Sequence, residues 1–347
     1  MDTEIVDFKT CMDENALLRA ADLIKSGRLV VFPTETVYGL GADATNAEAA
    51  RRIYEAKGRP SDNPLIIHVS NPSDAEKYAY TNEIYYTLAE KYMPGPLTVI
   101  LKAKDTVPKA TRGGLDTVAV RCPKNPVANK LIALAGVPIA APSANLSGSP
   151  SPTIAQHVIE DMSGRVDMII DGGECDFGLE STIVKIEDDG ALLLLRPGGV
   201  TVDDFISSGF VVRIADAVVS ELKPGETALS PGMKYRHYAP KAPVVLVGGK
   251  ISNIITYIRA ENNAEVALIW FDEDRELIAD KLPEAVFYNF GSRLDERRQA
   301  HLLFSLLREA DKGEYDIIYA PLPGKDGIAL ALYNRLIRAS AHKIIEL

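Results

Sequence analysis

The chain has 347 residues, of which 46% are hydrophobic and 25% charged, a composition typical of globular proteins. Its length favours two domains, and no apolar run approaches the roughly 18 residues of a membrane-spanning helix. The net charge of −10 argues against indiscriminate binding to a phosphate backbone. Three scattered cysteines favour a reducing cytoplasm, and we expect no secretory signal, disulfide framework or zinc site.

Short apolar runs alternate with helical periodicity through the first 200 residues, which predicts an α/β fold. The predicted strands cover residues 29–32, 65–69, 97–101, 118–120, 138–141, 168–170, 182–186 and 192–195. The predicted helices cover residues 16–26, 47–56, 84–91, 126–135 and 154–162. The last two strands form a hairpin around Asp188–Gly190, so we expect antiparallel additions to the sheet.

Residues 221–243 interrupt this alternation with four prolines, two glycines and little periodicity. We therefore predict a domain at 1–220, a linker at 221–243 and a smaller α/β domain at 244–347. The predicted strands of the second domain are 244–247, 266–270, 285–288 and 317–320, with helices at 294–310 and 328–341. This pattern resembles a Rossmann-like sandwich, but VVLVGGK lacks the glycine fingerprint that would specify a dinucleotide.

Two cations end the second predicted helix, in the stretch EAKGRPSDNPLIIHV. Lys57 and Arg59 flank a glycine, and Pro60 stops the helix, so the pair could form a compact anion site. The alternative is that both side chains only complement the helix dipole and face solvent. His68, at the end of the following strand, could equally be a structural histidine.

Three further polar clusters follow strands. In PIAAPSANLSGSPSPT a short strand runs into a loop with Ser143 and Ser151, which could instead be a plain turn. Thr117 and Arg121 lie four residues apart, hence on one face of a strand. Arg196 follows four leucines and must be paired or ligand-bound if it is buried, or else it reaches the surface.

Together these segments resemble the threonylcarbamoyl-AMP synthase family in its long, two-domain form. The resemblance rests on PTETVYGLGADA, KGRPSDNPLIIHV, PGPLT, APSAN with SGSPSPT, GLESTIV, LRPG and the linker SPGMKYRHYAP. It covers the first 200 residues and the linker densely, and the second domain only loosely. It implies a twisted mixed-sheet synthase domain followed by a smaller Rossmann-like domain.

The resemblance also implies a reaction. L-Threonine and bicarbonate or CO₂ form a carbamate, which attacks the α-phosphorus of ATP and releases pyrophosphate with Mg²⁺. The product, L-threonylcarbamoyl-AMP, passes to a transferase complex that modifies the adenosine beside the anticodon of certain tRNAs. No organic cofactor is expected, the metal ligands are unknown, and direct tRNA binding is possible but not indicated.

The implied site residues fall into three groups. Lys57, Arg59, Ser143 and Asn145 would be catalytic. ATP would be held by Arg59, Asn63, Thr117, Ser143, Ser151, Arg196, Tyr235 and His237, the last two closing over it from the linker. Threonine would be held by Thr34, Thr36, His68, Arg121, the backbone at Ala141, and Ser181, with Gly39 and Gly41 letting the backbone approach the pocket.

Three other functions stay open at this point. A double-stranded-RNA-binding module would use a concave basic surface, which the net charge of −10 disfavours. A carbamoyl-adenylate enzyme of hydrogenase maturation shares the synthase domain, but it requires zinc-finger cysteines and an acylphosphatase segment that this chain lacks. A nucleotide-binding regulator would bind ATP without turnover.

Overall fold

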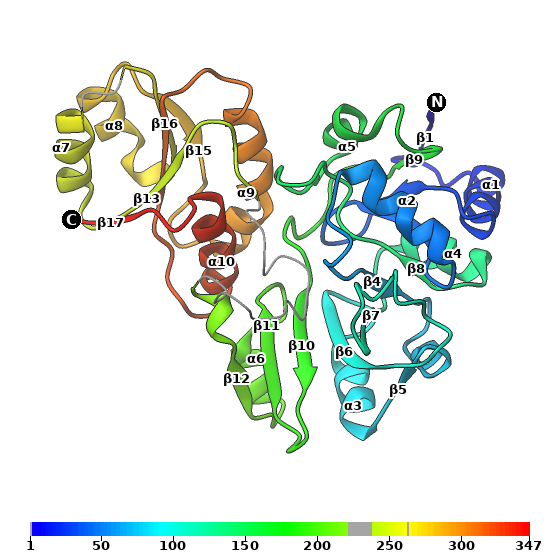
Figure 1. Ribbon diagram of the computed structural model, residues 1–347. Helices are drawn as coiled ribbons and strands as arrows, with labels where there is room; N and C mark the ends of the chain where they lie inside the picture. The colour runs from blue at the N-terminus through cyan, green and yellow to red at the C-terminus, as the bar shows by residue number, and fades with distance from the viewer. Residues whose placement is uncertain (1, 221–237, 262–263) are drawn as a thin grey trace. The chain divides into compact units, whose positions relative to one another are not determined.

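The computed structural model describes residues 2–220, 238–261 and 264–347. Of these, residues 2–147 and 151–220 form one compact unit, and residues 148–150 and 238–347 form a second (Figure 1). Most of the predicted linker at 221–243 lies outside the described residues, so the three domain boundaries given above stay predictions.

A mixed sheet of 12 strands organises the first unit (Figure 1). Its strands are β1 (Glu4–Asp7), β2 (Val30–Phe32), β3 (Gly39–Asp43), β4 (Ile66–His68), β5 (Ala79–Tyr80), β6 (Leu97–Ala103), β7 (Thr117–Arg121), β8 (Ile139–Ala140), β9 (Met168–Asp171), β10 (Thr182–Ile186), β11 (Leu192–Arg196) and β12 (Val212–Ile214). They lie in the order β1-β9-β2-β3-β8-β4-β7-β6-β10-β11-β12, with β5 paired to β6. Parallel and antiparallel pairs alternate irregularly, and β10 and β11 form the predicted hairpin.

Helices cover this sheet. They are α1 (Glu14–Lys25), α2 (Ala47–Lys57), α3 (Glu83–Tyr92), α4 (Pro126–Ala135), α5 (Ala155–Met162) and α6 (Val202–Ser207), with 3₁₀ turns η1 (Pro72–Lys77) and η2 (Asp216–Val218). Leu17 and Ile24 of α1 and Leu131 of α4 share a fully buried core with Phe32 and Ile170 of the sheet. Burying these apolar faces drives the packing of the two helices on the strands.

Local capping explains where the helices next to the site begin and end. The Asn46 side chain accepts the first amides of α2, and Gly58 ends that helix with a left-handed φ of 61°. The same signals frame α4, between Asn125 with Pro126 at its start and Gly136 after its end. Each helix therefore delivers its last residue to a defined corner, and Lys57 is that residue in α2.

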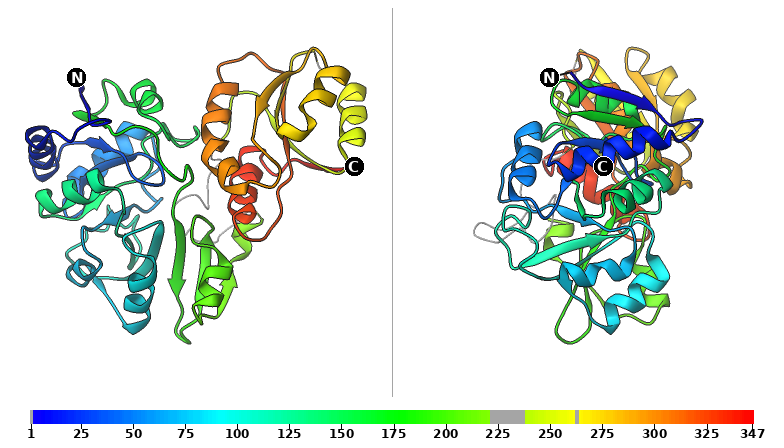
Figure 2. Two further views of the ribbon diagram at one scale, coloured as in Figure 1. Left: turned by 180° about the vertical axis from the view of Figure 1, so that it is seen from behind. Right: turned by 90° about the vertical axis from the view of Figure 1, so that its right-hand side faces the viewer.

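The second unit is a parallel sheet between helices. Its elements are β13 (Val244–Gly248), α7 (Ile251–Glu261), β14 (Val266–Trp270), η3 (Asp272–Asp274), α8 (Arg275–Lys281), β15 (Val286–Asn289), α9 (Glu296–Ala310), β16 (Ile317–Pro321), α10 (Ala329–Ala339) and β17 (Ile344–Glu346). The strand order is β15-β14-β16-β13-β17, and all four pairings are parallel. Figures 1 and 2 show α7 and α8 on one side of this sheet and α9 and α10 on the other. The predicted Rossmann-like architecture is confirmed.

Strand β3 was not among the predicted elements. Gly39–Asp43 pairs antiparallel with β2, with Val31 opposite Leu40. A Cβ added at Gly41 would lie 2.6 Å from Phe32 Cε1 and 2.8 Å from Ile139 Cγ2. Packing inside the sheet therefore requires glycine at position 41, and the approach of this backbone to the pocket stays a prediction.

Candidate active site

The loop between β2 and β3 is built around one threonine hydroxyl. Thr34 Oγ1 donates to the carbonyl of Val37 at 2.6 Å and accepts the amides of Thr36 and Val37. The Thr34 and Thr36 hydroxyls lie 2.8 Å apart, and the Thr36 carbonyl accepts the amide of Gly178. Thr34 therefore holds the turn that places Thr36, and the turn is joined to the loop before β10.

Within this turn, Glu35 forms a buried ion pair with Arg121 at the end of β7. Arg121 Nη2 lies 2.8 Å from Glu35 Oε1, and the two side chains are 5% and 8% exposed. Arg121 Nε also donates to the Gly95 carbonyl, at 3.4 Å. Burial alone would raise the pKa of Glu35, but the Arg121 guanidinium outweighs it and holds that pKa below its usual value.

The second carboxylate oxygen of Glu35 differs from the first. Among the residues that the structure describes, Oε2 is buried and has no hydrogen-bond partner. A buried acceptor without a donor costs about 1–3 kcal/mol, and more when it is charged. This buried oxygen therefore calls for an explanation from function.

His68 lies beside Arg121, because β4 and β7 pair in parallel with these two residues in register. Its Nδ1 lies 3.3 Å from the Ile139 carbonyl. Burial, and then the nearby guanidinium, lower the pKa of His68 to about 3. The imidazole is therefore neutral at pH 7, and its Nδ1–H donates to the carbonyl.

The hydroxyls of Ser181 and Thr98 and the side chain of Arg196 form a second group of contacts, next to Arg121. Ser181 Oγ lies 2.7 Å from Thr98 Oγ1, and Thr98 is paired with Arg121 across β6 and β7. Arg196 donates through Nε to the Ser181 carbonyl at 3.0 Å and through Nη2 to Ser181 Oγ at 3.1 Å. Arg196 is 7% exposed, which excludes the alternative that it reaches the surface. A residue predicted to hold ATP thus contacts one predicted to hold threonine.

Lys57 is buried at the end of α2 and does not face solvent. Its exposure is 2%, and its Nζ donates to the carbonyls of Ser143 and Asn145, each at 2.5 Å. The Ser143 hydroxyl in turn donates to Asn145 Oδ1, and the Lys57 carbonyl accepts the amide of Ser147. The ammonium thus helps to shape the loop after β8.

Arg59 and Asn63 follow Lys57 in the chain and contact each other. Arg59 Nη2 donates to the carbonyls of Asn63 and Pro64, at 3.5 and 3.3 Å. Asn63 is 3% exposed, and within the described part of the chain its Oδ1 has no hydrogen-bond partner. The Tyr54 hydroxyl holds the Asn63 carbonyl from α2 at 3.2 Å.

The backbone of Tyr38 connects the two groups of side chains. Its amide donates to Pro152 and its carbonyl accepts the amide of Ala144, at 2.9 and 2.8 Å. An isolated antiparallel bridge also joins Gly39 to Ser143. The hydroxyl-rich turn and the loop around Lys57 are therefore parts of one hydrogen-bonded assembly.

Two other predicted residues belong to this assembly. Ser151 is fully buried, and its hydroxyl donates to Glu180 Oε1 at 2.7 Å. The amide of Ala141 donates to the Ile66 carbonyl at 2.9 Å, so this amide is already engaged in the sheet.

Three predicted ATP ligands remain. Thr117 is the first residue of β7 and Arg121 the last, so Thr117 lies about 13 Å from Arg121 along the strand, at the end of β7 that pairs with the start of β4. Tyr235 and His237 lie outside the described residues, and their predicted contacts with ATP stay predictions.

Comparison with known proteins identifies the chain. A family model described as "Telomere recombination" matches residues 22–198, and one described as "Threonylcarbamoyl-AMP synthase, C-terminal domain" matches residues 206–341. A threonylcarbamoyl-AMP synthase of Pyrococcus abyssi is 43% identical over 99% of both chains. The chain belongs to the threonylcarbamoyl-AMP synthase family.

Two further likenesses agree with this assignment. The threonylcarbamoyl-AMP synthase of Bacillus subtilis is 40% identical, with 95% of this chain and 94% of that protein covered. A crystal structure of the Pyrococcus abyssi family member, complexed with L-threonine, is 42% identical, covers 99% of this chain and 100% of that one, and has a TM-score of 0.89. The predictions of the family, of the fold and of a nucleotidyltransferase-type enzyme that forms threonylcarbamoyl-AMP are confirmed.

The family assignment directs attention to residues that the sequence prediction did not assign to ligands. Glu35, Thr98 and Glu180 lie within the motifs PTET, PGPLT and GLEST, and each contacts a predicted site residue. Their position inside these motifs is the sequence feature that could have indicated a role in the site. Their partners became visible only in the fold, because Arg121, Ser181 and Ser151 are all at least 29 positions away in sequence.

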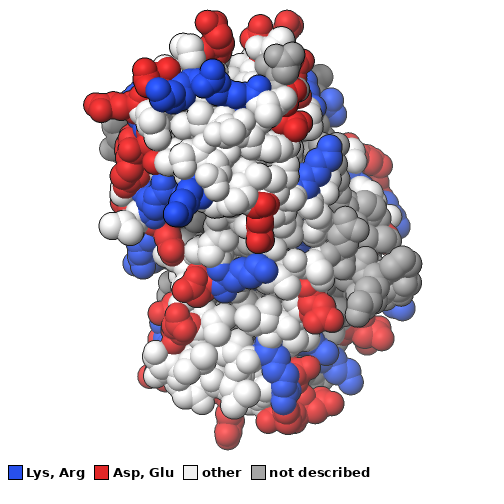
Figure 3. All heavy atoms as spheres, turned by 90° about the vertical axis from the view of Figure 1, so that its left-hand side faces the viewer, with Lys and Arg blue, Asp and Glu red and all other residues white. Residues whose placement is uncertain are grey.

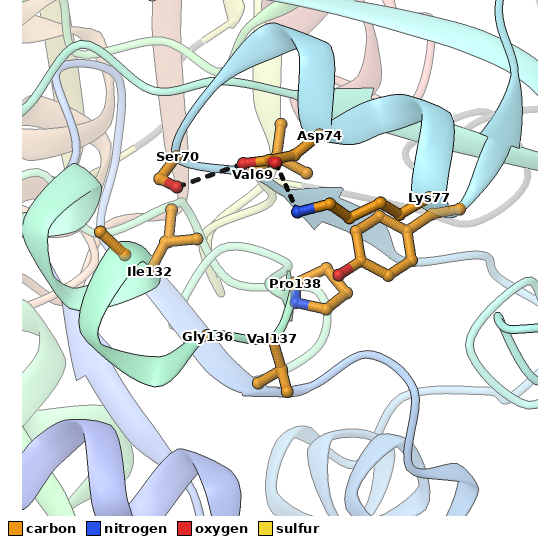
Figure 4. A pocket seen from close by; sticks show the side chains of 10 residues that line it. Val69, Ser70, Asp74, Lys77, Ile132, Gly136, Val137 and Pro138 are labelled. Atoms are coloured by element: carbon orange, nitrogen blue, oxygen red, sulfur yellow. Dashed lines mark hydrogen bonds and ion pairs between the residues drawn. The ribbon is translucent and has the colours of Figure 1, made fainter.

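A small surface pocket next to the site does not provide the same chemistry. Figure 4 shows it between η1, the end of α4 and the residues that flank β8, where it is lined by Val69, Ser70, Asp74, Lys77, Tyr78, Ile132, Ala133, Gly136, Val137 and Pro138. Its charged groups satisfy one another, because Lys77 Nζ lies 2.7 Å from Asp74 Oδ1. It contains none of the predicted site residues.

The described residues were also compared with the requirements of a metal site and of a membrane-spanning helix. In residues 2–220, 238–261 and 264–347 there is no cluster of three or more His, Cys, Asp or Glu side chains arranged to hold a metal ion. Over the same ranges, every helix is too short or too polar to span a membrane.

The state of His68 predicts a pH dependence of stability. Its pKa is about 3 when folded and about 6.5 when unfolded, so the unfolded chain binds an extra proton between these values. Stability from this group is complete above about pH 6.5 and falls with acidification by up to about 1.4 kcal/mol per pH unit. We expect the melting temperature of His68→Gln to decline less than that of the wild type from pH 7 to pH 4.5. An equal decline in melting temperature for the two proteins would contradict a buried neutral imidazole at His68.

Proposed function

We propose that this chain joins L-threonine, bicarbonate or CO₂, and ATP into L-threonylcarbamoyl-AMP and releases pyrophosphate. The supporting observation is the division of the site into two chemically different parts. One is a buried Arg121–Glu35 pair among hydroxyls, and the other is a buried Lys57 ammonium that donates to the carbonyls of Ser143 and Asn145. The relative crystallised with L-threonine supports the amino-acid half.

The threonine half of the proposal centres on Arg121. A guanidinium binds a carboxylate with two parallel hydrogen bonds, so Arg121 is the partner for the carboxylate of threonine. The hydroxyls of Thr36 and Ser181 and the neutral His68 would hold the side chain and the carbamate. Thr34 would act through the turn it holds, and Ala141 through its carbonyl, since its amide is engaged.

The ATP half centres on Lys57 and Arg59. The nucleophile is an anionic carbamate oxygen that must approach an anionic polyphosphate, so the reaction requires charge cancellation and alignment more than a strong base at phosphorus. Lys57 and Arg59 would supply positive charge. Ser143 and Asn145 would supply neutral donors, and Asn63 a buried amide beside them.

The other predicted ATP ligands have different support. Arg196 and Ser151 are buried in the assembly, and Arg196 contacts Ser181, so it would lie where the carbamate meets the α-phosphate. Thr117 would act from the start of β7, the end of that strand that lies next to the start of β4 and away from Arg121. The linker residues Tyr235 and His237 would close over ATP and exclude water from the mixed anhydride.

The partners and cofactor follow from the same reaction. Mg²⁺ would enter with ATP, since Mg²⁺ in nucleotide sites is held largely by phosphate oxygens and water, and it would neutralise the leaving pyrophosphate. The product would pass to a tRNA threonylcarbamoyl transferase complex in the cytoplasm. We propose no direct contact between this chain and tRNA. On the face in Figure 3, basic and acidic side chains are interspersed, without a continuous basic surface.

The substrate test is pyrophosphate release from ATP. Release should require threonine and bicarbonate together, and serine should be about 10- to 200-fold poorer, because one methyl in a pocket contributes about 1–3 kcal/mol. Assays with each amino acid, with and without bicarbonate, measure this selectivity. Equal release with leucine, or full release in bicarbonate-free buffer, would contradict the proposal.

The cation test replaces Lys57 and Arg59 separately by methionine. Each variant should lose about 10²-fold or more in kcat, the effect of removing a preorganised electrostatic donor. Lys57→Met should also lower the free energy of unfolding by about 1–3 kcal/mol, since two buried carbonyls lose their donor. Lys91→Met, at the exposed end of α3, is the matched control and should change neither quantity. Near-wild-type kcat in both site variants would refute the phosphate role.

A further inference from the structure

Formation of the carbamate poses a chemical problem that the charge-cancelling residues do not solve. An α-amino group has a pKa near 8, so at neutral pH most of it is an ammonium. An ammonium has no lone pair and cannot attack carbon. The site must therefore take a proton from threonine before the new carbon–nitrogen bond forms.

Glu35 has the geometry of that proton acceptor. Its side chain is more than nine-tenths buried, Arg121 occupies Oε1, and Oε2 is buried with no hydrogen-bond partner among the described residues. The hydroxyls of Thr34 and Thr36 lie in the same turn. A carboxylate oxygen in such a position is stabilised by a donor that the substrate brings, and an ammonium carries three.

We propose that Glu35 Oε2 binds the ammonium of threonine and removes one proton from it. This inference rests on the proposed function. One nitrogen–hydrogen bond breaks, its electron pair stays on nitrogen, and the proton forms an oxygen–hydrogen bond on Glu35. The neutral amine and bicarbonate then give the carbamate and one water. Glu35 is accordingly a catalytic residue of the carbamate step.

The ion pair with Arg121 couples this basicity to substrate binding. The titratable groups that act on Glu35 are Arg121, His68, Cys122 and Cys175. Burial raises the pKa of both thiols and lowers that of His68, so at neutral pH Arg121 is the charged member of this set. When the carboxylate of threonine shares the guanidinium, its pull on Glu35 weakens and the buried carboxylate becomes a stronger base.

His68 is the other basic side chain in this wall, and it is poorly suited to the task. Burial is the main cause of its lowered pKa, so a ligand that shares Arg121 would not restore its basicity as it would that of Glu35, and its Nδ1 is engaged by the Ile139 carbonyl at 3.3 Å. The carboxylate of Glu35, whose pairing with Arg121 weakens when threonine binds, is better suited to accept a proton transiently.

The test compares Glu35→Gln with the wild type by pyrophosphate release at saturating threonine, bicarbonate and ATP, from pH 6.5 to pH 9.5. We expect kcat of the variant to fall by about 10²- to 10⁴-fold at pH 7, the range for loss of a general base. The defect should shrink as the pH rises, because threonine then enters as the free amine. Glu55→Gln, at an exposed position of α2, should match the wild type throughout.

The outcomes separate this inference from its alternatives. An equal defect at every pH, or a raised KM for threonine with unchanged kcat, would show that Glu35 only pairs with charges, and would overturn the proposal. Should the glutamine variant not fold, Glu35→Asp replaces it, and its kcat should fall more at pH 7 than at pH 9. Failure of the wild type to release pyrophosphate with threonine would instead refute the proposed function.

Discussion

The candidate site depends on one buried ion pair, between Glu35 and Arg121. Removing two charges from water is costly, and such a pair contributes little net stability compared with apolar side chains of the same shape. The main contribution of this ion pair is to fix the positions of the two elements that it joins. Arg121 ends a central strand and Glu35 belongs to a turn held by Thr34, so the pair connects the sheet to the hydroxyl-rich loop. The pair thus fixes the guanidinium of Arg121 in the position from which, in the proposed function, it would bind the carboxylate of threonine.

The two halves of the site handle buried positive charge in opposite ways. A carboxylate neutralises Arg121, which makes that half suited to an amino acid carrying both charges. Lys57 Nζ donates instead to the carbonyls of Ser143 and Asn145. Lys57 and Arg59, two residues apart in sequence, bring two cations to this corner, which suits it to phosphate groups. This difference explains how one small assembly could bring an anionic nucleophile to a polyphosphate.

Sequence patterns predicted those parts of the fold that local chemistry determines. Strands β10 and β14 and helix α4 have the predicted bounds, because unbroken apolar runs or capping residues define them. Strand β3 was missed, since two glycines resemble a loop and only the nearby ring of Phe32 explains them. Helix α7 was missed as well. Motif order named many of the residues that the fold joins by hydrogen bonds, whereas the unpartnered oxygen of Glu35 and the burial of Lys57 depend on residues distant in sequence.

The central claim is that the Glu35–Arg121 pair forms the receptor for threonine. Calorimetric titration with threonine, without ATP or bicarbonate, tests it most directly. The double variant Glu35→Gln, Arg121→Gln replaces the pair by two neutral amide side chains and leaves no uncompensated buried charge. The account predicts that the wild type binds threonine and that the double variant binds it about 10²-fold or more weakly, the effect of losing buried charged contacts. Equal affinity in the two proteins, both with native circular dichroism, would contradict it.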